Sequence, residues 1–318
     1  MARGLERAGV DRVVQLPLAD GGEGTLDVIL AVRGGARRQA RVTGPLGDPV
    51  EAEWAMLGDG TAIVEMARAS GRALVDPARR DPLEASTRGT GELIAAAIRA
   101  GARRVIVGVG GSATTDGGLA AVQALDWQLG TVAVTVACDV TTEFLEAARI
   151  YGPQKGASAA QVGLLTRRLE QIAGTYRDRT GLDVTTLEGG GAAGGLAGGL
   201  AAIGARLEPG FEVVAQLVGL EDACDAADLV VTGEGKLDAT SFAGKVVGGV
   251  LELAGDLGVA HRGVIAGQIT DEAREELAGF GDVTALALTD RVWSAGEAFQ
   301  RAALLVEEAA VEIARSIS

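Results

Sequence analysis

Short, almost wholly apolar runs recur along the chain, and each of them stops at or near a glycine or an acidic residue. They cover residues 13–18, 105–109, 131–137, 229–232, 263–266 and 283–288. Continuous apolar runs of this length are typical of strands in parallel sheets that are covered on both faces. The pattern therefore predicts a series of buried β-strands, each followed by a loop that carries glycine or an acid.

Segments with helical periodicity lie between these runs. Residues 91–100 form one such segment, and residues 159–173 form another, which begins with a capping box of Ser158 and Gln161. Ser294 and Glu297 repeat that arrangement before a last helix, which is predicted to run nearly to the C-terminus. The alternation of strands and helices predicts the α/β class. In such sheets ligands bind beyond the carboxyl ends of the strands, where these loops would lie.

Residues 41–62 break the pattern, because polar and apolar residues alternate and turn sequences occur at Gly47-Asp48 and Asp59-Gly60. This alternation is typical of antiparallel strands joined by hairpins. We interpret the stretch as the entry into an inserted α/β domain that spans residues 41–220. Residues 1–40 and 221–318 would then form a second domain, built from both ends of the chain.

Composition narrows the classes of partner. The net charge of −14, from 29 basic and 43 acidic residues, argues against a nucleic acid partner. Two lone cysteines, Cys138 and Cys224, are typical of a reducing compartment. The uncharged stretch 189–205 lacks the bulky apolar side chains of a membrane helix, since 8 of its 17 residues are glycine. We therefore expect a cytoplasmic protein without a membrane span.

Residues 108–118, GVGGSATTDGG, are the strongest indication of chemistry. They follow an apolar run and precede a helical pattern, so several backbone N–H groups without helical partners would lie in one concavity. Such a concavity suits phosphate or another anion. Asp116 would stand at its rim, and an anion site beside a carboxylate suggests phosphoryl transfer.

Other interpretations of this loop stay open. Gly108, Gly110 and Ala113 satisfy the dinucleotide pattern G-x-G-x-x-A, but no acid is well placed about 20 residues later, so a dinucleotide-dependent dehydrogenase has less support. A tight turn with no ligand is the simplest alternative. A P-loop fails because Val246 follows Gly244-Lys245, and a chain whose one histidine is His261 leaves little basis for a Ser–His–Asp triad.

Acids at the ends of predicted strands, together with two loop lysines, complete the inventory that phosphoryl transfer needs. The acids are Asp20, Glu23, Asp116, Asp139, Glu234 and Asp238, and the lysines are Lys155 and Lys245. A lone loop acid is usually a helix cap or a turn former. Six of them at the edge where ligands bind favour a catalytic site.

With these residues the sequence resembles the bacterial type-1 glycerate kinase family. The resemblance rests on segments that occur in the family's order: LPLADGGEGT (16–25), VTGPLGDPV (42–50), EMARASG (65–71), STRGTGELI (86–94), VGVGGSATTDGG (107–118), ACDV (137–140), GPQKGAS (152–158), GGGAAGGLAGGL (189–200) and VTGEGKLD with AGK (231–238, 243–245). It implies an ATP- and Mg²⁺-dependent kinase that phosphorylates D-glycerate. It also implies a flavodoxin-like domain interrupted by a second α/β domain, with the site in the cleft between them.

The site residues follow from the inventory and the resemblance together. Asp116 is predicted as the base or as the acid that orients the hydroxyl group, with Asp20 as a second catalytic acid. Asp20, Glu234 and Asp238 are predicted to bind Mg²⁺ or its waters. The anion cradle would consist of Gly110, Gly111, Ser112 and Thr114, while Lys155 and Lys245 would bind phosphate or the glycerate carboxylate. Arg88 is a further candidate to clamp that carboxylate.

Three departures from the family pattern qualify the resemblance. Members open with a strand and an Ala-Pro-Asp-Ser-Phe-Lys segment, and this sequence starts after that point. They also carry a longer segment where only residues 126–131 stand here, and Thr142-Glu143-Phe144 replaces Asn-Pro-Leu. A parallel sheet without its first strand would expose unpaired backbone groups. The sequence thus predicts an N-terminally shortened and internally deleted member. The alternative is a catalytically impaired descendant that binds glycerate or a nucleotide, and a homodimer is one option for the assembly.

Overall fold

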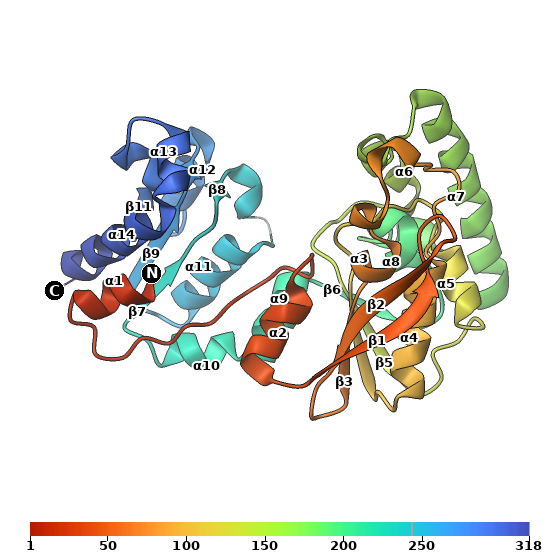
Figure 1. The fold of residues 1–318 in the computed structure, drawn as a ribbon, viewed down its shortest axis with the longest axis horizontal. Helices are drawn as coiled ribbons and strands as arrows, with labels where there is room; N and C mark the ends of the chain where they lie inside the picture. The colour runs from red at the N-terminus through yellow and green to blue at the C-terminus, as the bar shows by residue number, and fades with distance from the viewer. Residues whose placement is uncertain (243, 318) are drawn as a thin grey trace. The chain divides into compact units, whose positions relative to one another are not determined.

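The chain folds into two compact units of strands and helices (Figure 1). The computed structural model describes residues 1–242 and 244–317. Unit 1 consists of Met1–Leu18 and Ala215–Ser318, and unit 2 of Ala19–Val214. The sequence analysis places the changes of domain at residues 40/41 and 220/221. In the structure the first change comes earlier, because α2 (Thr25–Arg33) packs against strands of unit 2.

Unit 2 is built around a six-stranded mixed sheet, in which the strands lie side by side in chain order (Figure 1). The strands are β1 (Ala36–Thr43), β2 (Pro49–Met56), β3 (Thr61–Glu65), β4 (Arg104–Gly108), β5 (Ala133–Ala137) and β6 (Arg206–Glu208). The first three pair in antiparallel fashion, and β3 to β6 pair in parallel. The predicted hairpin turns are confirmed, with positive φ at Gly47 and Gly60.

Helices cover both faces of this sheet. Ala62 and Val64 of β3 pack in one core with α4 (Arg88–Arg99), α5 (Leu119–Ala124) and α8 (Ala192–Ala202). Ile63 points the other way, because successive side chains of a strand alternate between faces. There α2 contributes the fully buried Leu26 and Ile29.

A second apolar cluster extends unit 2 beyond the helices of the first core. It joins α5 and α8 to α6 (Ala147–Tyr151) and α7 (Ala159–Thr180), with Phe144 and Tyr176 fully buried at its centre. The capping box of Ser158 and Gln161 begins α7 as predicted. Two further helices are α3 (Ala67–Ser70) and α9 (Gly210–Val218).

Unit 1 has a parallel three-stranded sheet in the order β11 (Val283–Ala287), β9 (His261–Ala266), β7 (Leu229–Thr232). One face packs on α11 (Val246–Asp256) and α12 (Asp271–Ala278), and the other on α1 (Ala2–Arg7) and α14 (Ala302–Ser316). A short parallel pair, β8 (Lys236–Leu237) with β10 (Gln268–Ile269), and the helices α10 (Leu220–Asp225) and α13 (Ala295–Gln300) complete the unit.

The α/β class is therefore confirmed, and the structure corrects two details. Residues 13–18 are not a strand: they pair with no other strand among the described residues, most are partly or fully exposed, and Pro17 offers no N–H group. The last predicted helix is two helices, α13 and α14, which meet at Arg301. Throughout residues 1–242 and 244–317, no helix combines the length and the apolar character that crossing a bilayer requires.

Candidate active site

The loop from Val109 to Gly118 connects β4 to α5 and is held by hydrogen bonds with neighbouring segments of the chain. Ala113 N donates to Ser70 O at 3.0 Å, and Arg72 N donates to Gly111 O at 2.8 Å. On the other side, the Tyr176 hydroxyl donates to Gly117 O at 2.8 Å. A loop whose backbone is bonded on both sides holds its side chains in fixed positions, as a preorganised site requires.

The glycine-rich segment 189–199 packs against this loop. Ala193, Gly194 and Gly195 have left-handed backbone angles that interrupt α8. Gly194 O accepts a hydrogen bond from Gly117 N at 3.0 Å, and a Cβ on Gly194 would lie 2.0 Å from Thr114 O. The glycines of this segment therefore allow a contact that larger residues would prevent.

Gly110 and Gly111 make close contacts within unit 2. A Cβ on Gly110 would lie 2.6 Å from Gly22 Cα, and one on Gly111 would lie 2.1 Å from Glu23 Oε1. The segment ADGGEGT thus packs directly on the predicted cradle. Ser112 beside it is half-buried, whereas Thr114 has an exposed fraction of 0%.

Asp116 belongs to the loop and is buried, with an exposed fraction of 9%. Its Oδ2 accepts hydrogen bonds from Thr87 N and Thr87 Oγ1, both at 2.8 Å, and its Oδ1 accepts one from Gly118 N at 3.2 Å. Burial raises the pKa of Asp116, and these hydrogen bonds oppose that rise. The carboxylate therefore links the first residue before α4 to the start of α5.

Lys155 reaches the same loop from a short 3₁₀ turn, Pro153–Lys155. Its side chain is buried, with an exposed fraction of 3%, and Nζ donates to Thr114 O at 2.5 Å. Burial lowers the pKa of Lys155 to about 7, against the opposing attraction of Asp116, and the charge of Arg72 lowers it further. Such a displaced pKa is common at functional sites.

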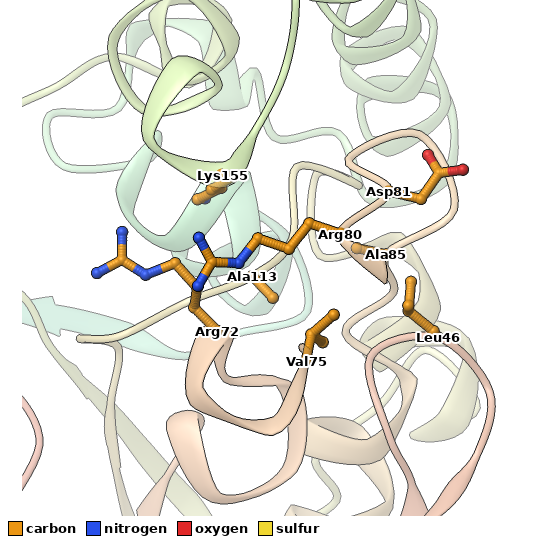
Figure 2. A pocket seen from close by; sticks show the side chains of 8 residues that line it. All are labelled: Leu46, Arg72, Val75, Arg80, Asp81, Ala85, Ala113 and Lys155. Carbon is orange, nitrogen blue, oxygen red and sulfur yellow. The ribbon is translucent and has the colours of Figure 1, made fainter. Parts of the chain in front are cut away.

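A small hollow opens beside the loop, and Figure 2 shows its lining. Arg72, Arg80 and Lys155 supply three cationic groups, and the apolar wall comes from Leu46, Val75, Ala85 and Ala113. Asp81 also lines the hollow, but its carboxylate points away from the guanidinium groups (Figure 2). The hollow is therefore basic on one side and apolar on the other.

The other predicted site residues do not line this hollow: Arg88 and Asp20 lie elsewhere in unit 2, and three more belong to unit 1. Arg88 Nε pairs with Glu92 Oε1 at 2.9 Å on the exposed side of α4. Asp20 is in unit 2, where its Oδ1 accepts a hydrogen bond from Gly22 N at 3.2 Å. Glu234, Asp238 and Lys245 belong to unit 1.

The predicted metal ligands do not form a ready-made cluster. Among the described residues, no group of three or more His, Cys, Asp or Glu side chains is arranged to hold a metal ion. The Asp238 carboxylate bonds to Thr240 and pairs with Lys236 at 3.5 Å, and the hydrogen bonds from Thr240 lower its pKa. The roles of Asp20, Glu234 and Asp238 as Mg²⁺ ligands stay predictions.

Sequence reasoning missed Arg72, Arg80 and Thr87. Thr87 lies in the recognised segment STRGTGELI and directly precedes α4, but the predicted helix begins only at residue 91, so its capping position was not evident. The two arginines carry no comparable signal. They reach Lys155 only because chain segments more than 70 residues apart pack together, which no local spacing reveals.

Comparisons with known proteins show to which family the chain belongs. The sequence matches the model of the glycerate kinase family over residues 1–131 and 125–318. It is 42% identical over 296 residues to the glycerate 2-kinase of Escherichia coli (strain K12), a match that covers 81% of this chain and 77% of that protein. It is 38% identical over 354 residues to the glycerate kinase of Halalkalibacterium halodurans, covering 98% and 92%.

A solved structure has the same fold. The protein, described as glycerate kinase 2 from Salmonella typhimurium LT2, aligns with a TM-score of 0.85 at 36% identity, over 99% of this chain and 92% of that chain. The two family-model matches overlap at residues 125–131, the connection that the sequence analysis identifies as short. Asp126 and Trp127 in this connection have positive φ angles of 50° and 61°. The chain belongs to the glycerate kinase family.

Proposed function

We propose that this chain transfers the terminal phosphoryl group of ATP to a hydroxyl group of D-glycerate. The observation that carries the proposal is the approach of Lys155 to Thr114 and Asp116 of the loop, which belong to another family motif about 40 residues earlier in the sequence. The relatives named as glycerate kinases support the same reaction. A cytoplasmic location would supply the nucleotide.

Asp116 is the proposed proton acceptor. A hydroxyl group that attacks a phosphoryl group must lose its proton, and a carboxylate with a raised pKa is a good acceptor. Burial raises the pKa of Asp116. Thr87 donates two hydrogen bonds to Oδ2, so we assign Thr87 as a positioning residue for this carboxylate. Asp20 stays the second predicted catalytic acid.

The nucleotide and its metal ion would need further residues. ATP with Mg²⁺ supplies the phosphoryl group when bound, and Mg²⁺ commonly binds one or two carboxylates together with substrate phosphates. Glu234 suits this role, because its exposed carboxylate makes no hydrogen bond or ion pair with any described residue. Lys245 precedes α11, whose first N–H groups have no partner within the helix, and would bind phosphate.

The proposal is tested by measuring ADP release from ATP and Mg²⁺ by the purified full chain, with D-glycerate or glycerol as acceptor. We expect release that depends on D-glycerate. Asp116→Asn should lower kcat by roughly 100-fold or more, the scale of general acid–base catalysis. Asp126→Asn, an exposed control, should leave kcat unchanged. A folded chain without D-glycerate-dependent release contradicts the function, and normal kcat in Asp116→Asn contradicts the role of that residue.

A further inference from the structure

Three cationic side chains face the hollow beside the active-site loop, where the charge of Asp116 attracts Lys155 without forming a salt bridge with it. Within residues 1–242 and 244–317, none of Arg72, Arg80 and Lys155 takes part in an ion pair. Acidic residues outnumber basic ones in the sequence, 43 to 29. The neighbouring Arg79 pairs with Asp48 at 3.0 Å, whereas these three side chains have no such partner among the described residues. Like charges that share a low-dielectric space repel one another, so an anion bound among them would be favoured.

The hydrogen-bonding groups of the hollow also lack acceptors. The Nε–H group of Arg80 is buried, and no atom of the described residues accepts its hydrogen bond. Arg72 uses Nη1 to donate to Gln154 O at 3.3 Å, which leaves other guanidinium N–H groups available. A guanidinium group has a planar fork of donors that matches the two oxygens of a carboxylate. A buried N–H group without an acceptor lowers the stability of the folded chain, and a bound carboxylate that accepts its hydrogen bond would remove this cost.

We propose that this hollow receives the carboxylate of the acid that the enzyme phosphorylates, with Arg72, Arg80 and Lys155 as its ligands. The inference rests on the proposed function and names the part of the site that selects an acid over an uncharged alcohol. Ala113 lines the hollow between Ser112 and Thr114, so an acid bound there contacts the active-site loop.

A nucleotide phosphate has the same charge, but the lining of the hollow favours a small acid. The apolar wall of Leu46, Val75 and Ala85 suits a short carbon chain better than a second phosphate group. We therefore assign the hollow to the acceptor substrate.

The test compares Arg80→Gln and Arg72→Gln with the control Arg79→Gln, which removes an exposed arginine next to Arg80. We expect KM for D-glycerate to rise by roughly tenfold or more in the first two variants, about 1.4 kcal/mol, while KM for ATP stays the same. The control should match the unmodified chain in both constants. Melting temperatures report whether each variant folds, and half-buried Arg72 provides the test if Arg80→Gln does not fold.

Two results overturn the assignment. A rise in KM for ATP alone would show that the hollow binds a nucleotide phosphate. Unchanged KM values for D-glycerate and ATP in both variants would show that the hollow binds neither substrate. Calorimetric titration with D-glycerate separates this inference from the proposed function. Binding without turnover that is lost in Arg80→Gln supports the hollow and contradicts the function. Normal turnover and normal KM values in both variants would support the proposed function and contradict the role of the hollow.

Discussion

The charge of Lys155 should control how strongly the enzyme holds its acid substrate. Burial lowers the pKa of this side chain to about 7, so its ammonium group loses its proton as the pH rises through neutrality. An anion in the hollow interacts favourably only with the protonated form. The other titratable groups around Lys155 are Arg72, Arg80, Asp81, Asp116, Tyr151 and Tyr176. The arginines keep their charge, and burial raises the pKa of Tyr176 far above neutrality, so Lys155 is the cation that changes.

The size of the effect follows from that pKa. A group with a pKa of about 7 is roughly nine-tenths protonated at pH 6 and about one-hundredth protonated at pH 9. If the acid binds only the protonated form, KM for D-glycerate rises about 90-fold over this range, and the slope approaches tenfold per pH unit above about pH 8. The loss of binding free energy is about 2.7 kcal/mol.

The assay is KM for D-glycerate at saturating ATP between pH 6 and pH 9, on the full chain and on Lys155→Met. Methionine fills the buried space without a charge, so its KM should be flat with pH and at least as high as that of the unmodified chain at pH 9. KM for ATP serves as the internal control. A KM for D-glycerate that is flat or falls with pH in the unmodified chain would refute the reasoning. So would the same slope in Lys155→Met.

Two further predictions concern the backbone around the site. Asp126→Gly should raise the free energy of unfolding, measured in urea, by about 0.5–1 kcal/mol, because Asp126 has a φ of 50° that glycine adopts without strain. The control Asp178→Gly, within α7, should lower the free energy of unfolding. A change of the same sign in both variants would contradict the argument. Gly194→Ala should cost more than about 2 kcal/mol and raise KM for D-glycerate, because its Cβ would lie 2.0 Å from Thr114 O, the acceptor of the Lys155 hydrogen bond. Gly174→Ala in open space on α7 should instead be neutral or stabilising, and a tolerated Gly194→Ala would show that the loop is free to move.

The elements of the fold were predictable where local chemistry determines them. Continuous apolar runs located β4, β5, β7, β9 and β11, and the capping box at Ser158 located the start of α7. Residues 13–18 have the same apolar character but no partner strand, so composition alone gave a wrong prediction. Strand formation depends on pairing with another segment, and a single run of sequence does not carry that information.

The site was predictable only in part, for a related reason. Asp116 and Lys155 stand in glycine-rich loops at strand ends or in short turns, so their positions suggested chemistry. Arg72 and Arg80 are ordinary arginines in sequence, and their importance depends on which neighbours the fold leaves without a partner. Arg88 is the arginine that the sequence analysis predicts as a carboxylate ligand, and in the structure it pairs with Glu92 one helical turn later.

The most direct test of the central claim is the rate of ADP release by the full chain with ATP, Mg²⁺ and D-glycerate, measured beside the same reaction with glycerol. We predict release with D-glycerate and little above background with glycerol, because the alcohol lacks the carboxylate that the hollow of Arg72, Arg80 and Lys155 would bind. Equal rates with the two acceptors would contradict the proposed carboxylate site. No release with D-glycerate from a folded chain would contradict the proposed kinase activity itself.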